Sequence, residues 1–275
     1  MKDDFVATAV VQSTGIFNNK TRMELLLAVT RRVGSMIHCD GVILFPAGYF
    51  NAGQGEANAI LPWVGREIGS NLAGSEQNIV ICVGIDGWVQ AQMPRDQLVV
   101  AIGKQGVKAL GRKFYPTKRE RGKIHFANNH LLEEQGYSRI FSLNTRRYYI
   151  AVCYDVFGIK RLALTNPEVG AILNCVHGFY LPKQGAAGVS LFTRHGFAGA
   201  SKQWGCPVFG TAVFFNRSVP KDWPSGVYWN QGSKSTKEWA YSDNPIKELE
   251  SLCVRLSQEI VFVKAHDLAD CPGFN

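Results

Sequence analysis

The first fifty residues alternate between two spacings of apolar side chains, and this alternation restricts the fold more than any other feature of the sequence. The segments 5–12 and 41–45 are short apolar runs, which are typical of buried strands. Between them, the segment 20–37 places Met23, Leu26 and other apolar residues at helical spacing. A strand, a helix and a strand in this order predict an α/β protein.

The same alternation continues through the rest of the chain. A helix is expected over 57–72. Further buried strands are expected over 78–85, 98–102, 147–153, 171–176, 206–216 and 259–264. The segment 159–169 is expected to be a helix or a loop, 186–202 a helix with several glycines, and 223–243 a hairpin or irregular excursion. Two sets of strands with helices between them predict two sheets packed back to back with helices outside.

Length and composition are those of one folded domain. The chain has 275 residues, 46% of them hydrophobic and 19% charged, which suffices for one large core. We therefore expect a single domain over residues 1–275. The seven cysteines include no Cys-x-x-Cys pair, which argues against a disulfide framework and against a zinc site. We expect free thiols, no metal and no cofactor.

The sequence does not favour secretion, membrane insertion or nucleic-acid binding. Asp3 and Asp4 precede a short apolar run, whereas a signal peptide needs a basic start. The longest apolar runs, such as 79–85, are far shorter than the roughly 20 residues of a membrane helix. The net charge is +8, and the densest basic stretch, 118–123, is typical of a solvated loop. We expect a cytoplasmic protein that binds neither membranes nor nucleic acid.

Several common catalytic motifs are absent from the sequence. Gly106 and Gly111 have the spacing of a phosphate-binding loop, but Arg112 and Lys113 follow where that loop requires Lys and then a hydroxyl residue. Gly-x-Ser-x-Gly and His-Glu-x-x-His do not occur. The sequence therefore contains no motif that supports nucleotide binding through such a loop, serine hydrolysis or metallopeptidase activity.

Cys153 stands at the end of a strongly apolar strand, in the local sequence IAVCYDVFG. In α/β sheets, ligands bind in the crevice at the carboxyl ends of the strands, so this is a suitable position for a nucleophile. A free cysteine is also commonly a small buried residue, and this description suits Cys82, Cys175 and Cys206 better. Cys153 is the candidate nucleophile.

Three segments, in this order, resemble the carbon-nitrogen hydrolase (nitrilase and amidase) superfamily. GVILFPAGYF at 41–50 is similar to the strand that supplies the family's glutamate after Phe-Pro. GRKFYP at 111–116 is similar to its Arg-Lys segment, and VCYDVFG at 152–158 to its nucleophile turn. The resemblance implies an α-β-β-α sandwich and a small amide-like or nitrile substrate. It also implies that two subunits stack into an α-β-β-α-α-β-β-α homodimer.

The resemblance also assigns roles to individual residues. Cys153 is the nucleophile, Lys113 the cation that stabilises the oxyanion, and the backbone amide of Tyr154 a further oxyanion donor. The match fails at the general base, because Ala47 stands where the family has glutamate. A methyl group cannot accept a proton, and loss of a general base costs roughly a hundred- to ten-thousand-fold in rate.

Two routes around Ala47 are open. A lysine beside a thiol favours the thiolate, although the leaving amine still needs a proton. Alternatively, another carboxylate replaces the base. Glu120 resembles the family's second glutamate on the lysine loop, and we prefer it to Glu56; Glu120 is equally well explained as one charge within a basic stretch.

Three further residues are candidates for the substrate pocket because they follow strand ends: Tyr49, Tyr154 and His177. Aromatic residues and histidine at such positions also commonly serve packing. Asp155, next to the nucleophile, is expected to support the turn.

The leading hypothesis is a thiol-dependent hydrolase of a carbon-nitrogen bond that works through an acyl intermediate on Cys153. The alternative is an impaired or inactive pseudoenzyme that binds a small molecule or a protein, for which Ala47 is the evidence. Transfer of the acyl group to an acceptor other than water is a third possibility that no residue separates from hydrolysis.

Overall fold

The computed structural model describes residues 4–15, 18–88, 95–180, 187–221, 223–229, 232 and 252–269. Its strands are β1 (Phe5–Ser13), β2 (Gly41–Leu44), β3 (Phe50–Asn51), β4 (Ile79–Trp88), β5 (Arg95–Gly103), β6 (Gly106–Arg112), β7 (Ile124–His125), β8 (Ile140–Leu143), β9 (Arg146–Val152), β10 (Ala171–Phe179), β11 (Val208–Phe215), β12 (Gly226–Val227), β13 (Cys253–Leu256) and β14 (Glu259–Asp267). Its α-helices are α1 (Asn19–Met36), α2 (Leu61–Leu72), α3 (Asp155–Arg161), α4 (Ala187–Leu191) and α5 (Ala198–Trp204).

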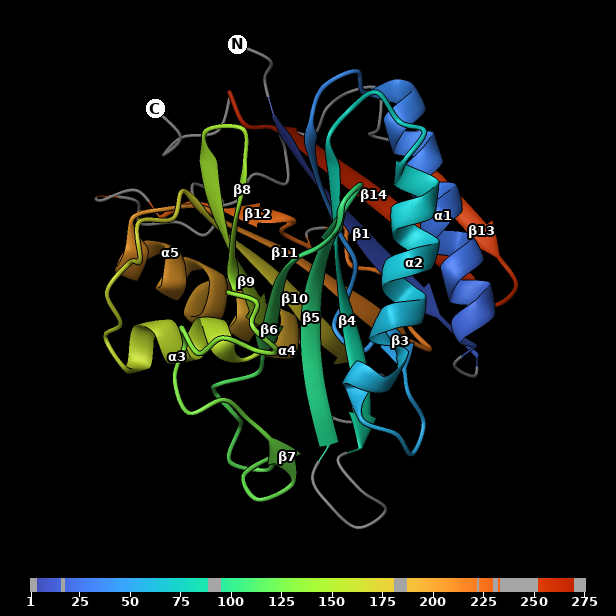
Figure 1. Cartoon of the computed structure of the whole chain (residues 1–275). Helices are drawn as coiled ribbons and strands as arrows, with labels where there is room; N and C mark the ends of the chain where they lie inside the picture. The colour runs from blue at the N-terminus through green and yellow to red at the C-terminus, as the bar shows by residue number, and fades with distance from the viewer. Residues whose placement is uncertain are drawn as a thin grey trace.

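The central strand is β1, because three other strands pair with it. β2 and β11 lie parallel to β1, and β14 lies antiparallel to it. Among the described residues all fourteen strands belong to one sheet, whose main order is β6-β5-β4-β2-β1-β11-β10-β9-β8 (Figure 1). The two halves of this sheet meet at the β1–β11 pair and pack against each other, with β9 touching both β5 and β6.

Alternate residues of β1 belong to two different cores. Val6 and Val10 face the core between the two halves of the sheet. Ala7 and Val11 face the core beneath α1 and α2. This alternation follows from the two-residue period of a strand, and it explains why β1, which is buried on both faces, is mostly apolar.

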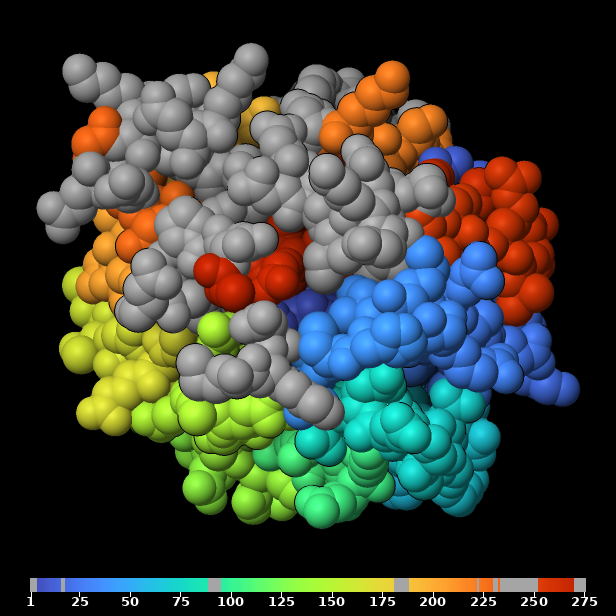
Figure 2. All heavy atoms as spheres, turned by 90° about the horizontal axis from the view of Figure 1, so that it is seen from above, coloured from blue at the N-terminus to red at the C-terminus, as the bar shows by residue number. Residues whose placement is uncertain are grey.

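Helices cover the outer faces of both halves. In Figure 1, α1 and α2 lie on one flank, and α3, α4 and α5 on the other. Seen from above, the blue and cyan N-terminal segments occupy one side of the molecule and the yellow segments the opposite side (Figure 2). The layers are therefore helix, sheet, sheet, helix, and the predicted α-β-β-α sandwich is confirmed.

Local sequence accounts for the starts of the helices. The side chain of Asn18 accepts hydrogen bonds from the backbone N–H groups of Lys20 and Thr21, which caps α1. Pro62 stands in the first turn of α2, where its missing N–H costs no hydrogen bond. A 3-10 turn over Ala57–Ile60 precedes α2, so the helix expected over 57–72 begins as a tighter turn.

Three expectations need correction or completion. The two predicted sheets are joined into one, because β1 and β11 are hydrogen-bonded neighbours. The segment 159–169, expected to be a helix or a loop, contains the end of α3, which begins earlier and ends at Arg161, followed by a loop. The segment 186–202 is helical from Ala187, with a π-helical turn over Phe192–Phe197.

The segment 223–243 is described only in part. Its described portion includes β12, which pairs with β11, and the remainder lies outside the described residues. None of the helices in the described part of the chain is long and apolar enough to cross a membrane.

Candidate active site

Cys153 occupies the sharp turn between β9 and α3. Its φ angle is 53°, in the left-handed region that non-glycine residues rarely adopt. Two contacts with β10 hold the turn: the N–H of Cys153 donates to the carbonyl of Cys175 (2.8 Å), and the carbonyl of Cys153 accepts from Nδ2 of Asn174 (3.2 Å). Strained backbone of this kind is concentrated at functional sites, where the surrounding structure maintains it.

Asp155 joins the nucleophile turn to the segment that contains Lys113. Its Oδ1 atom accepts hydrogen bonds from the backbone N–H groups of Phe114 and Tyr115, both at 2.9 Å. Its Oδ2 atom accepts from the N–H of Val152 (3.0 Å) and from Nη1 of Arg139 (2.9 Å). The side chain is fully buried. Asp155 therefore supports the turn, as expected, and it also fixes the lysine segment beside the cysteine.

Lys113 lies directly after β6 and its side chain is fully buried. Nζ of Lys113 donates to Oε1 of Glu120 at 2.7 Å. Burial opposes the charge of Lys113, but the negative charges of Cys153 and Glu120 outweigh this effect and raise the pKa of Lys113. The ammonium group therefore stays charged at neutral pH and favours a thiolate at Cys153.

Glu120 is held by two partners. Besides Lys113, the backbone N–H of Thr117 donates to Oε2 of Glu120 at 2.8 Å. Burial acts to raise the pKa of Glu120, but the charge and hydrogen bond of Lys113 outweigh it and leave the pKa lowered. Glu120 thus borders the site as expected, but as a stable carboxylate whose affinity for a proton is reduced.

Ala47 follows the end of β2 and lies beside β10. Its N–H donates to the carbonyl of Val176 at 3.2 Å, so the next residue of β10, His177, is its neighbour. Gly48 has a φ of +61°, and a Cβ atom at this position would lie 3.0 Å from Oδ2 of Asp86 and 3.2 Å from Cδ2 of His177. The side chains of Asp86 and His177 therefore lie beside Gly48, the residue after Ala47, and both line the cavity that Ala47 borders.

His177 is part of a β-bulge. In the pairing of β10 with β11, Cys175 pairs with Thr211 and Gly178 with Val213, so β10 has one residue more than β11 between these two pairs. The extra residue falls in the stretch that contains His177, and such bulges redirect a side chain next to a functional site. Nε2 of His177 lies 3.0 Å from Oδ1 of Asp86 at the end of β4.

His177 and Cys153 shift each other's protonation. Burial acts to lower the pKa of His177, but the charge and hydrogen bond of Asp86, together with contact with Cys153, raise it to about 10. Burial acts to raise the pKa of Cys153, but the charge of Lys113 and hydrogen bonds from His177 lower it. A proton on His177 therefore favours the thiolate of Cys153, and the thiolate in turn favours the proton on His177.

These groups border one cavity of about 380 Å³, and most of the predicted site residues line it. The lining includes Ala47, Glu120, Cys153, Tyr154 and His177. The ring of Tyr154 stacks on that of Phe157 with centroids 4.6 Å apart, and Nζ of Lys113 lies 5.9 Å from the Tyr154 centroid.

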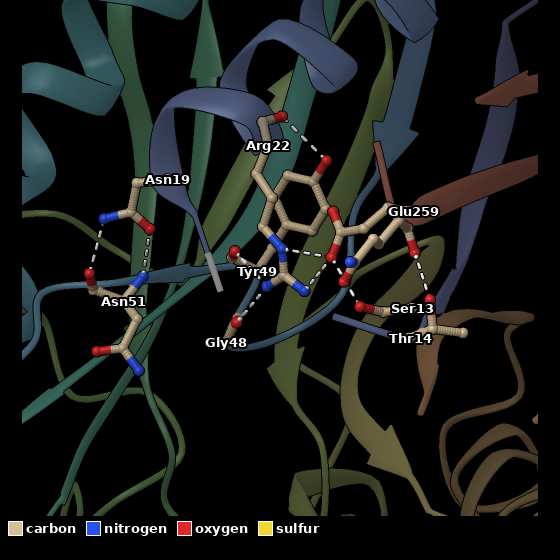
Figure 3. A network of polar contacts seen from close by, with 9 residues as sticks. Ser13, Thr14, Asn19, Arg22, Gly48, Tyr49, Asn51 and Glu259 are labelled. Carbon is tan, nitrogen blue, oxygen red and sulfur yellow. Dashed lines mark hydrogen bonds and ion pairs between the residues drawn. The ribbon is translucent and has the colours of Figure 1, made fainter. Parts of the chain in front are cut away.

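Tyr49, which was predicted for the pocket, lies elsewhere. Its side chain is fully buried in the core beneath α1 and α2, and its hydroxyl donates to the carbonyl of Arg22 (3.0 Å). Figure 3 shows this network: Nη1 of Arg22 donates to the carbonyls of Gly48 and Tyr49, and Nε of Arg22 donates to Oε1 of Glu259 (2.9 Å). Tyr49 therefore anchors the turn that carries Gly48, on the side away from the cavity.

Asp86 was not identified from the sequence, although a signal for it exists. It directly follows the apolar run 79–85, and β4 lies parallel to β2. The rule that singled out Cys153, a reactive side chain at a strand end, applies equally to Asp86. Trp88, Arg95 and Tyr180 also line the cavity and were not predicted.

Comparisons with known proteins identify structural neighbours. No protein-family model matches the sequence, and no curated protein matches it. The solved structure of an amidase from Nesterenkonia sp. AN1 has a TM-score of 0.54 and 12% identity, covering 77% of this chain and 76% of that chain. A mutant of that amidase, with the acetamide moiety of fluoroacetamide attached to its active-site cysteine, has a TM-score of 0.56 and 11% identity over 77% of each chain.

A second kind of enzyme shares the fold. A glutamine-dependent NAD(+) synthetase from Cytophaga hutchinsonii has a TM-score of 0.50 and 14% identity. The match covers 79% of this chain but 37% of that chain. The likeness to both enzymes is a likeness of fold.

Proposed function

We propose that this chain, whose fold is that of the nitrilase-superfamily amidases, hydrolyses a carbon-nitrogen bond of a small amide-like substrate through an acyl intermediate on Cys153. The observation that carries the proposal is a strained cysteine in the wall of the cavity, whose thiol pKa is lowered by the charge of the buried Lys113. Lys113 has no exposed side-chain surface, and Cys153 is only 7% exposed. A thiolate in such an environment is the reactive form of a cysteine nucleophile.

The proposed reaction begins with attack of the Cys153 sulfur on the carbonyl carbon. The negative charge that develops on the carbonyl oxygen is stabilised by the ammonium group of Lys113 and by the backbone N–H of Tyr154. Breaking the carbon-nitrogen bond releases an amine and leaves a thioester. Water then attacks the thioester carbon, which releases a carboxylic acid and restores Cys153.

The cavity supports a small substrate. Its volume of about 380 Å³ is near the lower end of the range for ligand pockets, roughly 300–1,000 Å³. The similarity to the Nesterenkonia amidase supports the amide class, because a mutant of that enzyme carries an acetamide moiety on its cysteine.

Release of ammonia from a panel of short amides and nitriles tests the proposal, with intact-protein mass spectrometry to detect an acyl adduct. The wild-type chain is expected to turn over at least one member and to form an adduct that maps to Cys153. Cys153→Ala should abolish both signals, whereas Cys253→Ala, which removes an exposed thiol, should change neither.

A pseudoenzyme is the alternative that Ala47 supports. It predicts no turnover and no adduct with any member of the panel. If ligands stabilise the wild-type chain against heat without any chemical change, the binding-protein function replaces hydrolysis.

A further inference from the structure

We propose that His177, oriented by Asp86, makes the proton transfers for Cys153 that no carboxylate at position 47 can make. The site then works as a cysteine-histidine-aspartate triad built on this fold. The catalytic role of His177 rests on the proposed hydrolase function. The arrangement of His177, Asp86 and Ala47 does not depend on any substrate.

The first argument is position. Ala47 contributes only a methyl group to the cavity. Its backbone N–H donates to the carbonyl of Val176, and the next residue in the chain is His177. A Cβ atom on Gly48 would be in tight contact with Oδ2 of Asp86 (3.0 Å) and Cδ2 of His177 (3.2 Å). Small residues at 47 and 48 therefore make the space that the imidazole and its carboxylate partner fill.

The second argument is orientation. Asp86 engages Nε2 of His177 at 3.0 Å, which leaves Nδ1 as the ring nitrogen for exchange of a proton with the thiol. His177 and Cys153 line the same cavity, which places the ring on the side of the nucleophile. A base near the nucleophile, held in turn by a third group, is the general pattern of an activated nucleophile.

The third argument is access. The side chains of His177 and Asp86 keep 22% and 16% of their surface exposed, so a substrate nitrogen or a water molecule in the cavity can reach the ring. Glu120, the other candidate base, already accepts the hydrogen bond from Lys113 and that from the N–H of Thr117. Its arrangement suits support of Lys113 rather than proton transfer.

The charged groups around the ring come from several elements. Asp86 on β4 and Arg95 on β5 line the cavity with His177, as does Glu120 after β6. Lys113 pairs with Glu120, so these two charges largely compensate each other. Asp86 is the group in direct contact that favours a protonated ring.

Each proton has a defined path in this scheme. The thiolate of Cys153 attacks the amide carbon, forming the C–S bond. As the C–N bond breaks, the imidazolium of His177 gives its proton to the nitrogen, and the amine leaves. The neutral ring then takes a proton from water as the resulting hydroxide attacks the thioester carbon. The C–S bond breaks, the acid leaves, and the thiolate faces an imidazolium again.

The test compares wild type with His177→Ala and His177→Gln, using p-nitrophenyl acetate in stopped flow. The nitrophenolate leaving group needs no proton, so the acylation burst should persist in both variants. Hydrolysis of the acetyl-enzyme should slow roughly a hundred- to ten-thousand-fold, because water loses its base. His38→Ala is the matched control, since His38 is exposed and lines a different cavity; it should behave as wild type.

Alkylation of Cys153 by iodoacetamide, measured from pH 5 to 10, provides a readout that needs no substrate. Loss of the ring should move the midpoint of the alkylation curve to higher pH in His177→Ala. Asp86→Asn, a positioning variant, should move it in the same direction by less. Circular dichroism and thermal unfolding identify any variant that fails to fold, and His177→Gln, which keeps a similar volume, then replaces His177→Ala.

The outcomes separate the two proposals. A shifted alkylation curve without turnover of any ester or amide retains the pairing of His177 with Cys153 and rejects hydrolysis. Turnover with an unshifted curve and unchanged deacylation in His177→Ala overturns the role of His177. Slow deacylation in Glu120→Gln, but not in either His177 variant, overturns it as well and assigns the base to Glu120.

Discussion

Nε2 of His177 lies 3.0 Å from Oδ1 of Asp86, although the two residues are 91 positions apart in the chain. This contact stands next to Ala47, where a hydrolase of this fold would be expected to have its basic carboxylate. Ala47, Asp86 and His177 line the same cavity, which is why we propose His177 as the replacement for the missing base.

The first prediction is a bell-shaped pH dependence of kcat/KM for an amide substrate. At low pH the thiolate of Cys153 is protonated, and the lowered pKa of this thiol places the rising limb below the ordinary value of about 8.5. Above pH about 10, His177 loses the proton that the leaving amine needs, so activity falls. Both limbs belong to the coupled pair. A rate that keeps rising to pH 11 contradicts this prediction.

The second prediction is that Cys153 is the most reactive thiol. Burial raises the pKa of Cys82 and raises that of Cys206 to about 12, whereas the pKa of Cys153 is lowered. Iodoacetamide labelling at pH 6.5 with peptide mapping should therefore modify Cys153 first. Lys113→Ala should slow this labelling about tenfold or more, since one pKa unit is a tenfold change in thiolate.

Lys108→Ala is the matched control for the labelling experiment, because Lys108 is an exposed residue of the same strand, β6. It should leave the rate unchanged. Earlier labelling of Cys82 or Cys206, or equal rates in Lys113→Ala and wild type, would show that the pairing of cysteine and lysine is wrong.

The third prediction concerns stability. Asp155→Ala leaves the fully buried Arg139 without its carboxylate and removes the acceptor of three backbone N–H groups. The free energy of unfolding in urea should fall by about 3–5 kcal/mol. Glu168→Ala breaks the exposed pair with Arg147 and should cost less than about 1 kcal/mol. Similar losses in the two variants would refute the structural role of Asp155.

The fourth prediction is a homodimer formed through the face that carries the nucleophile turn, which the sequence resemblance implies. Light scattering should give twice the mass of one 30.4 kDa chain. Leu162, at the end of α3, is 55% exposed on this side, so Leu162→Asp should weaken the dimer. Leu131→Asp, at another exposed leucine, is the control. A monomer at micromolar concentration counts against the assembly.

The fifth prediction concerns Ala47→Glu. In the wild-type background the new carboxylate lies beside Asp86 and fills part of the cavity, so amide hydrolysis should fall. In the His177→Ala background the same carboxylate can act as the base, and hydrolysis should recover by up to roughly a hundredfold. A rise of activity in the wild-type background would mean that no other group serves as the base.

The sequence alone determined the elements of the fold and the nucleophile segment. The strands at 5–12, 41–45 and 78–85 were predictable because apolar periodicity is a property of neighbouring residues. Cys153 and Lys113 were predictable because each stands in a short segment whose residue types carry the resemblance.

Only the tertiary structure decided which side chains meet at the site. His177 faces Asp86 because of a bulge in β10 and the order of the strands, neither of which has a local signal in the sequence. Tyr49 was misplaced because the left-handed turn at Gly48 sends it to the core below the sheet. Periodicity is set within a few residues, whereas contacts between strands depend on pairings that connect distant parts of the chain.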